Sequence, residues 1–318
     1  MISKKSCKMT IFYERYSFII RIMKYAIVVD SSSALTQEQA RKLNWHYLPL
    51  HIVINGKEYR DGIDVNSLNL FEFYGKKEDG KTSAVNLGLA EELFTKLSKE
   101  FDKVLVYPIS KNLSGGCASL TALAKDFENI RVVQSIQVLQ MIILDLVWFE
   151  HQMSIDSSKF EEYVVQMEKG VGRKYATLIP KYNDYLVKGG RLHPTAAAAA
   201  KMFKIVPKIC WEDGFLKKEG IGRNFLKTSL KAVEDKAQIL PIDNNKKLIT
   251  MALHSMSDEQ ELMPFCAKIT EILGVEPIID LIAPVVSIHT GPEALAVLAF
   301  EVEPEIQQKF KDLFKLVK

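Results

Sequence analysis

Five short polar clusters carry the side chains of this sequence that are best suited to binding an anion. Several of them follow apolar runs that predict buried strands. Ligands of α/β sheets bind outside the carboxyl ends of the strands, so these clusters are the candidate site. They are Asp30 to Ser33, Thr82-Ser83, Ser110 to Gly116, Gly189-Gly190-Arg191 and His289 to Pro292.

The segment from Ser110 to Gly116 (SKNLSGG) is the most informative of the five. It joins a predicted strand to a predicted helix, and Ser114 stands where an N-cap is expected. A helix N-terminus with Gly115 and Gly116 beside it offers backbone N–H groups to an anion. We expect Asp30 and Ser31 to support this loop region. The alternative is that Ser114 only caps the helix.

The remaining candidates also have structural alternatives. Arg191 follows a glycine pair, and a guanidinium is well suited to a carboxylate or phosphate, although a surface arginine after a turn is the alternative. His289 precedes a Gly-Pro pair, and a lone histidine is more often structural than functional. Thr82 and Ser83 supply hydroxyls to a ligand or cap the following helix.

Several common sites are excluded by pattern. The sequence contains neither Gly-x-x-x-x-Gly-Lys-Ser/Thr nor Gly-x-Ser-x-Gly, which argues against a Walker-type nucleotide site and a nucleophile elbow. No metal site is predicted, because five histidines lack metal-ligand spacing: His46, His51, His151, His193 and His254. Buried free thiols in a reducing cytoplasm are expected for the four cysteines, Cys7, Cys117, Cys210 and Cys266.

Alternating strands and helices must position these clusters in the first half of the chain. The predicted strands cover residues 25–30, 46–54, 103–109 and 130–133. The predicted helices cover residues 36–43, 68–77, 87–100, 114–127 and 138–149, with Thr36 as an N-cap. Such alternation is typical of a mostly parallel sheet covered by helices. We therefore predict an N-terminal three-layer α/β domain over residues 24–172.

The second half changes pattern. Strands are predicted over residues 175–179, 203–209, 247–253, 277–281 and 295–300, and 215–218 reads as a hairpin arm after Asp213-Gly214. Helices are predicted over residues 195–202, 226–239 and 258–273. This order indicates a C-terminal α/β domain with a mixed sheet over residues 173–318.

The charge is distributed unevenly along the chain. Lys+Arg is 42 and Asp+Glu is 39, a net +3 that is too weak to argue for nucleic acid. We interpret residues 1–23 as a basic N-terminal extension, either upstream of a start at Met23 or a basic amphipathic membrane anchor. No window is apolar over the roughly 20 residues that a transmembrane helix needs.

A second basic segment covers residues 188–231, which hold ten basic and three acidic residues. Our hypothesis is that it docks an acidic partner or touches a membrane surface, and the alternative is a solvated basic face. The docking candidates are Lys201, Lys204, Lys208, Lys217, Lys218 and Arg223.

Taken in order, the motifs resemble those of the DegV family, whose best-understood members are bacterial fatty-acid-binding proteins. No motif is decisive alone, but together they run from Lys24 almost to the C-terminus. They are KYAIVVDSSSALT, YRDGID (59–64), KTS (81–83), ISKNLSGG (109–116), YLVKGGRL (185–192), residues 205–214 and SIHTGP (287–292).

The resemblance implies a two-domain α/β protein that holds a long-chain fatty acid between its domains without a further cofactor. It implies carboxylate-binding roles for Thr82, Ser83, Ser114, Arg191 and His289. It also implies a cytoplasmic bacterial carrier rather than an enzyme. In the resembled system a separate fatty acid kinase phosphorylates the bound acid with ATP, and the acyl-phosphate enters phospholipid synthesis.

The sequence departs from the family pattern beside the expected site. It has Ala84-Val85 where Gln-Pro is common, Gly116 where threonine is common, and Glu293 where glycine is common. The first two changes leave Thr82, Ser83 and Ser114 in place but alter the expected hydrogen-bond set around the carboxylate, and Glu293 changes the charge near His289. Two other functions stay open: an acyl hydrolase or transferase that uses Ser114 and His289, and a lipid-responsive regulatory protein without a kinase partner.

Overall fold

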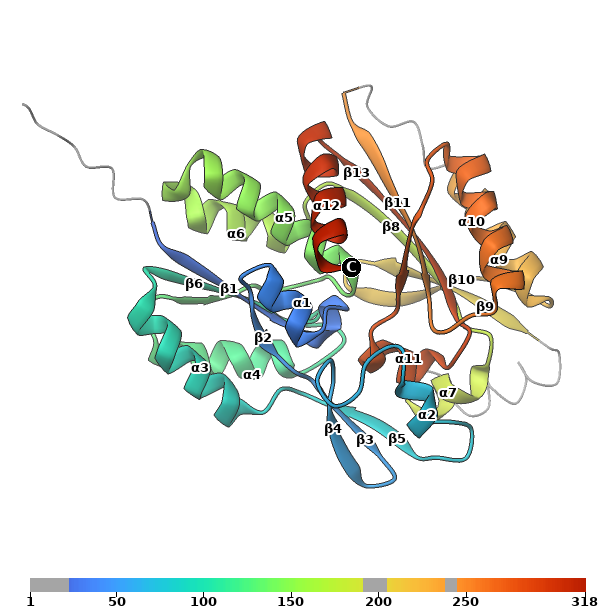
Figure 1. Ribbon diagram of the computed structural model, residues 1–318, viewed down its shortest axis with the longest axis horizontal. Helices are drawn as coiled ribbons and strands as arrows, with labels where there is room; N and C mark the ends of the chain where they lie inside the picture. Colours follow the sequence, from blue (N-terminus) through green and yellow to red (C-terminus); the bar gives the residue numbers. More distant parts are fainter. Residues whose placement is uncertain (1–22, 191–204, 238–244) are drawn as a thin grey trace, which may run out of the picture.

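A four-stranded parallel sheet forms the centre of the first half of the chain (Figure 1). The computed structural model describes residues 23–190, 205–237 and 245–318. The strand order is β2-β1-β6-β7, and all three pairs are parallel. The strands are β1 (Tyr25–Asp30), β2 (His46–Leu48), β6 (Lys103–Tyr107) and β7 (Ile130–Val132). Val28 and Val29 are fully buried, as expected for a sheet covered on both faces.

Helices on both faces of this sheet make the three layers (Figure 1). Figure 1 shows α3 and α4 on one side and α5 and α6 on the other. The helices of this part are α1 (Gln37–Lys42), α2 (Leu70–Phe73), α3 (Leu87–Glu100), α4 (Gly116–Leu123), α5 (Gln140–Ile155) and α6 (Phe160–Lys169). Thr36 caps α1 in a capping box with Gln39, and Asn86 caps α3.

A small antiparallel sheet, in the order β4-β3-β5, projects from this part. Its strands are β3 (His51–Ile54), β4 (Lys57–Arg60) and β5 (Gly80–Ser83). The single strand predicted over 46–54 is therefore wrong: Pro49 and Leu50 separate β2 from β3, which belong to different sheets. Proline lacks the N–H that a continuous ladder needs.

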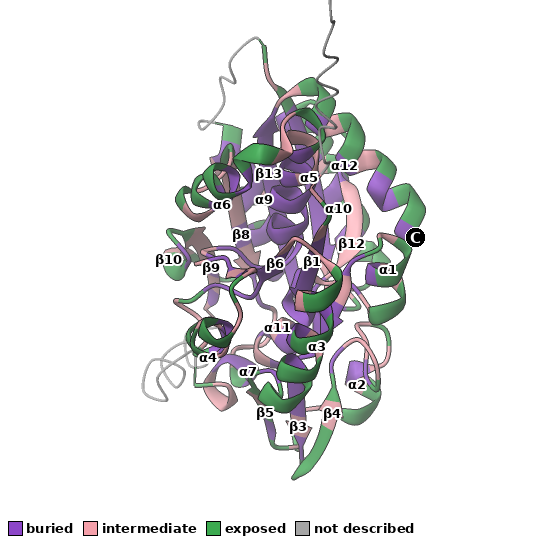
Figure 2. Ribbon diagram, turned by 90° about the vertical axis from the view of Figure 1, so that its left-hand side faces the viewer, coloured by how far each residue is buried: buried purple, intermediate pink, exposed green. Residues whose placement is uncertain are grey.

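The second sheet has six strands in the order β10-β9-β8-β13-β11-β12 and is mixed, as expected. Only β11 and β12 run parallel; the other neighbours are antiparallel. The strands are β8 (Arg173–Ile179), β9 (Val206–Glu212), β10 (Phe215–Gly222), β11 (Lys247–His254), β12 (Ile278–Leu281) and β13 (Leu295–Val302). Figure 2 shows β13 as buried and β10 as largely exposed at the sheet edge.

The helices of the second half lie on both sides of this sheet. They are α7 (Asn183–Lys188), α9 (Phe225–Lys236), α10 (Glu259–Leu273), α11 (Pro284–Thr290) and α12 (Pro304–Val317). Helices α9 and α10 cover the outer face (Figure 1) over a second apolar cluster that includes Val233, Phe265 and Val297. Helix α12 packs against α1 and α5, so the end of the chain returns to the first half.

Other predictions need correction. The helix predicted over 68–77 shortens to α2, because Asn66 accepts the N–H of Leu68 and Asn69 before it begins. Thr82 and Ser83 do not cap a helix; they end strand β5. The predicted extension 1–23, except Met23, and the helix over 195–202 lie outside the described residues. Within the described ranges, no helix is long and apolar enough to cross a membrane.

Candidate functional site

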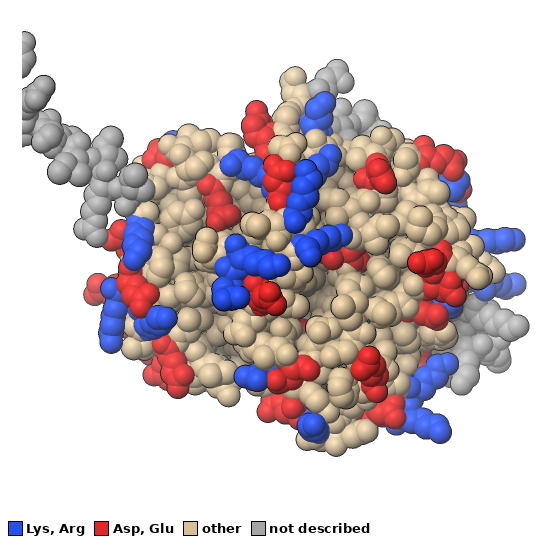
Figure 3. Space-filling view, in the orientation of Figure 1, with Lys and Arg blue, Asp and Glu red and all other residues tan. Residues whose placement is uncertain are grey.

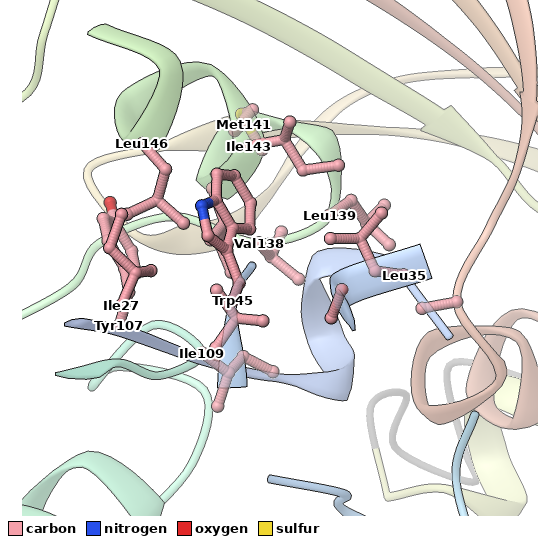
Figure 4. Close-up of a cluster of buried hydrophobic side chains, with 14 of the residues drawn as sticks. Ile27, Leu35, Trp45, Tyr107, Ile109, Val138, Leu139, Met141, Ile143 and Leu146 are labelled. Carbon is pink, nitrogen blue, oxygen red and sulfur yellow. The ribbon is translucent and has the colours of Figure 1, made fainter. Parts of the chain in front are cut away.

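A cavity of about 220 Å³ lies between the parallel sheet and the inner face of the mixed sheet. Its walls come from both halves of the chain and are mostly apolar. The apolar lining residues include Ile109, Leu113, Val138, Leu139 and Met141 from the first half, and Ala176, Leu178, Leu186, Ile209, Trp211, Leu216, Ala296 and Leu298 from the second. Figure 4 shows Ile109, Val138, Leu139 and Met141 in one buried cluster. Such a lining suits a long apolar ligand.

Four of the five predicted carboxylate-binding residues line this cavity: Thr82, Ser83, Ser114 and His289. They come from β5, the loop before α4, and the last turn of α11. Thr82 Oγ1 and His289 Nε2 are 3.0 Å apart, across 207 residues of sequence. The fold thus joins Thr82 to His289 and places Ser83 and Ser114 in the same lining, which is mostly apolar but also includes Thr177 and Thr290.

Arg191 lies outside the described residues, but the glycines before it do not. The backbone of Gly189 lies against the ring of His289, where a Cβ would be only 2.1 Å from Nδ1. Any larger residue at this position would displace the imidazole. The Gly-Gly motif is therefore adjacent to the polar end of the cavity.

The loop before α4 differs in detail from the prediction. Gly115, not Ser114, is the N-cap residue of α4. Ser114 Oγ instead accepts the N–H of Gly116 at 3.1 Å, and a Cβ at Gly116 would lie 3.4 Å from that oxygen. Ala84, one of the departures from the family pattern, lines the cavity close by. Ser114 is half-buried, so its hydroxyl remains available on the cavity wall.

Asp30 and Ser31 do not line the cavity, but they form hydrogen bonds to the segments that carry its lining residues. The Asp30 carboxylate accepts the N–H of Ile109 at 2.7 Å and the Ser32 hydroxyl at 2.5 Å. Ser31 Oγ accepts the N–H of Leu50 at 3.0 Å. Burial raises the pKa of Asp30 to about 6. These contacts tie the end of β1 to the segment that carries Ser114.

Sequence reasoning missed Asp61, although it lies in the YRDGID motif. Its Oδ2 accepts the N–H of Val285 at 3.3 Å, in the first turn of α11. Burial raises the pKa of Asp61 to about 8. The residue therefore helps to hold the helix that carries His289. The only sequence signal for this role is the position of an acidic residue between a strand and a glycine.

The hairpin of β9 and β10 closes one side of the cavity, and its tip is bonded to the first half of the chain. Ser110 Oγ donates to the Gly214 carbonyl at 3.0 Å, and Asn112 Nδ2 donates to the Asp213 carbonyl at 3.0 Å. Trp211 Nε1 donates to the Ile136 carbonyl at 3.1 Å. The predicted hairpin turn is confirmed, and these three bonds hold it across the cavity.

The predicted docking set is only partly available at the surface. Lys208 is buried and bonded to Asp235, so its inclusion was wrong: an unpaired buried ammonium would be costly. Lys217 Nζ pairs with Glu212 at 3.1 Å, while Lys218 and Arg223 are exposed. Lys201 and Lys204 lie outside the described residues. Figure 3 shows basic and acidic side chains interspersed over the face seen in Figure 1.

The fold and cavity define a class: α/β proteins with a mostly apolar cavity between a parallel and a mixed sheet. The chain belongs to the DegV family, whose model, described as an uncharacterised protein of that family, matches residues 24–302. A DegV domain-containing protein of Mycoplasmopsis pulmonis is 37% identical over 292 residues, which cover 92% of this chain and all of that one.

Solved structures with the same fold include proteins described as fatty-acid-binding. One is a fatty-acid-binding DegV family protein from Thermus thermophilus, with a TM-score of 0.70 and 20% identity over 88% of this chain and 100% of that one. Another, from Eubacterium ventriosum, is described as a stearic-acid-binding protein; its TM-score is 0.69, with 23% identity over 89% of this chain and 99% of that one. At these identities the likeness shows the two-domain fold.

Proposed function

We propose that this protein binds a long-chain fatty acid, with the acyl chain in the cavity and the carboxylate at its polar end. The observation that carries the proposal is the composition of the lining: Thr82 is bonded to His289, Ser83 and Ser114 line the same cavity, and most of the other lining residues are apolar. The carboxylate would be bound by Thr82, Ser83, Ser114 and His289, with Arg191 as a further partner outside the described residues.

The energetics suit this ligand. Burying about 15 methylenes at about 0.8 kcal/mol each contributes on the order of 10 kcal/mol before ordering costs. A charge-assisted hydrogen bond adds roughly 1.5–3 kcal/mol. The tail therefore supplies most of the affinity, and the polar end fixes the direction in which the acid is held.

The test is to purify the protein natively, extract it with organic solvent and analyse the extract by mass spectrometry. A stoichiometric long-chain fatty acid is the expected result. If no acyl chain is extracted, and none binds to the delipidated protein at micromolar concentration, the proposal fails.

We further propose that the bound acid is presented to a separate fatty acid kinase, which phosphorylates it with ATP to an acyl-phosphate. The polar end of the cavity supports this, because Ser83 and Gly115 beside it are exposed and would let a partner approach. Among the described docking residues, Lys218 and Arg223 are exposed and pair with no described acid, whereas Lys217 pairs with Glu212. These two residues therefore suit an acidic partner.

Charge reversal tests this second step. The Lys218→Glu/Arg223→Glu variant should bind fatty acid as the wild type does but couple less well to the kinase in an acyl-phosphate assay. A Lys125→Glu variant, exposed on the first half of the chain, is the matched control. Unchanged acyl-phosphate formation by the double variant would contradict the docking hypothesis.

The hydrolase or transferase alternative finds no support in the geometry. A serine nucleophile needs a base within hydrogen-bond reach. His289 Nε2 is instead bonded to Thr82, and Ser114 Oγ accepts the N–H of Gly116. Turnover of acyl esters that is lost in Ser114→Ala would restore the hydrolase or transferase alternative. A bound fatty acid in a protein without any kinase partner would favour a regulatory role.

A further inference from the structure

Three apolar residues of the cavity lining, Met141, Ala176 and Leu298, lie on the elements that also carry Asp145 and Lys174 or pair with them, and we call these three residues the cavity floor. Ala176 pairs with Leu298 across β8 and β13, one alternation further from the polar end than the pair Leu178 and Ala296. Met141 lies in the first turn of α5 and is buried.

A buried polar network lies immediately beyond this floor. Asp145 follows Met141 by four residues on α5, so both side chains lie on one face of that helix. Lys174 precedes Ala176 by two residues on β8, so both lie on one face of that strand. On α5, one helical turn separates the floor residue from the network residue. On β8, one strand alternation separates them. The sequence prediction assigned no role to these groups.

The network is buried, and its two charged groups are paired with each other. Lys174 Nζ donates to Asp145 Oδ1 at 2.5 Å and to the Val171 carbonyl at 2.7 Å. Tyr107 OH donates to Asp145 Oδ2 at 2.6 Å. The side chain of Asp145 is 0% exposed and that of Lys174 is 6% exposed. Figure 4 shows Tyr107 in the same buried cluster as Met141.

Such a network resists displacement by a growing acyl chain. Separating a buried, hydrogen-bonded ion pair costs several times what the burial of one more methylene contributes. A methyl end that reaches Met141 and Ala176 therefore gains nothing by pushing further. Apolar side chains alone would yield more easily, because they can repack without losing paired charges.

We propose that the Tyr107–Asp145–Lys174 network, with Met141 above it, sets the upper limit of acyl chain length in this cavity. This inference rests on the proposed function and deepens it: Met141, Asp145 and Lys174 are specificity-determining residues for the length of the fatty acid.

The experiment measures dissociation constants of the delipidated protein for saturated fatty acids of increasing length. For the wild type, affinity should rise about fourfold per methylene, which is about 0.8 kcal/mol, and then stop rising at a defined length. Met141→Ala should move that length upward and Met141→Trp should move it downward.

The network itself is tested by replacing all three members with apolar side chains of similar size. Tyr107→Phe/Asp145→Leu/Lys174→Met leaves no charge unpaired, so the fold should be retained. Acids two and four carbons beyond the wild-type limit should bind this variant at least tenfold tighter than they bind the wild type. Leu186→Ala, in a wall of the cavity away from the floor, is the control: it should weaken all lengths equally and leave the limit in place.

The outcomes separate the two proposals. If the wild type binds no fatty acid, the proposed function fails. If it binds fatty acids but the limiting length is the same in both Met141 variants and in the triple variant, only the role of the floor and network is overturned. Shifts in opposite directions for Met141→Ala and Met141→Trp, with relaxation in the triple variant, establish it.

Discussion

The hydrogen bond between Thr82 and His289 is the contact on which the candidate site depends at the level of single residues. It joins β5 to α11 at 3.0 Å and orients both groups into the cavity. The ring of His289 is held from its other side by the close approach of Gly189. The departure at Glu293 does not add a free charge here, because its carboxylate accepts the Tyr182 hydroxyl at 2.6 Å and pairs with Lys181 at 3.1 Å.

Removing the Thr82 hydroxyl should weaken fatty-acid binding without unfolding the protein. Thr82→Val keeps the shape of the side chain but loses a hydrogen bond to a charged group, which is worth roughly 1.5–3 kcal/mol, or about 10- to 150-fold in the dissociation constant. Titration of delipidated protein measures this. Thr95→Val, at an exposed position on α3, is the control, and equal affinities of Thr82→Val and the wild type would contradict the assignment.

Asp61 should make folding stability depend on pH. Its pKa is raised to about 8, against about 3.9 for an ordinary aspartate, so the folded state holds this proton more tightly than the unfolded chain does. The stabilisation is therefore present below about pH 4 and is lost as the pH rises towards 8. Relative to Asp61→Asn, the wild type should lose up to about 1.4 kcal/mol of unfolding free energy per pH unit in this range.

Urea denaturation at several pH values measures the difference between wild type and Asp61→Asn. The asparagine can still accept the N–H of Val285, so the variant separates ionisation from the loss of the hydrogen bond. Asp126→Asn, at an exposed position, should keep the wild-type profile. A constant difference between wild type and Asp61→Asn from pH 5 to 8 would refute the assignment.

The hairpin of β9 and β10 is the element whose attachment bears most directly on the cavity. Its residues Ile209, Trp211 and Leu216 line the wall, while its tip is bonded to Ser110 and Asn112 of the other half. The SKNLSGG motif thus has two structural tasks: Ser114 faces the cavity, and the residues before it hold the hairpin.

Loosening the hairpin tip should speed the release of a bound fatty acid. Ser110→Ala/Asn112→Ala removes two side-chain hydrogen bonds worth roughly 0.5–1.5 kcal/mol each, so the dissociation rate should rise roughly 5- to 150-fold. Displacement of a fluorescent fatty acid in a stopped-flow instrument measures this rate. Ser98→Ala is the matched control, because Ser98 is a half-buried serine on α3 whose hydroxyl donates to the Thr95 carbonyl at 3.2 Å. An unaltered rate in the double variant would show that the hairpin is not a barrier to release.

The whole molecule is joined around the cavity by contacts between its halves. The Lys174–Asp145 pair links β8 to α5, Asp61 links the small sheet region to α11, and α12 returns to pack on α5. These contacts surround the cavity with an interface that is largely buried. The boundary near residue 172 stays a prediction, but the six-stranded sheet begins at Arg173.

Breaking the buried pair on one side only should destabilise the whole molecule. Lys174→Met leaves Asp145 buried without its cation, and such a loss typically costs about 3–5 kcal/mol. The triple apolar variant should lie close to the wild type in unfolding free energy. Thermal and chemical unfolding of the two variants compare them, and equal stabilities would show that the charge at Asp145 is compensated by other groups.

Local signals determined several elements before any tertiary structure was known. The strand β1 and the helix α3 have the predicted bounds, because a run such as YAIVVD and a cap such as Asn86 act within a few residues. The split of the strand predicted over 46–54, the short α2, and the helices α11 and α12 escaped prediction. Their formation depends on which sheet or helix each segment packs against, and on Asp61 at the start of α11.

The sequence by itself determined the α/β class, the order of the polar motifs and the chemical nature of the groups available to a ligand. Only the tertiary structure brought Thr82 to His289, placed Lys208 inside, and set a buried ion pair beneath the cavity floor. The physical reason is the distance along the chain over which each kind of interaction acts. Capping, strand alternation and turn chemistry act between near neighbours, whereas a cavity and its limits arise where packed surfaces from segments far apart in the chain meet.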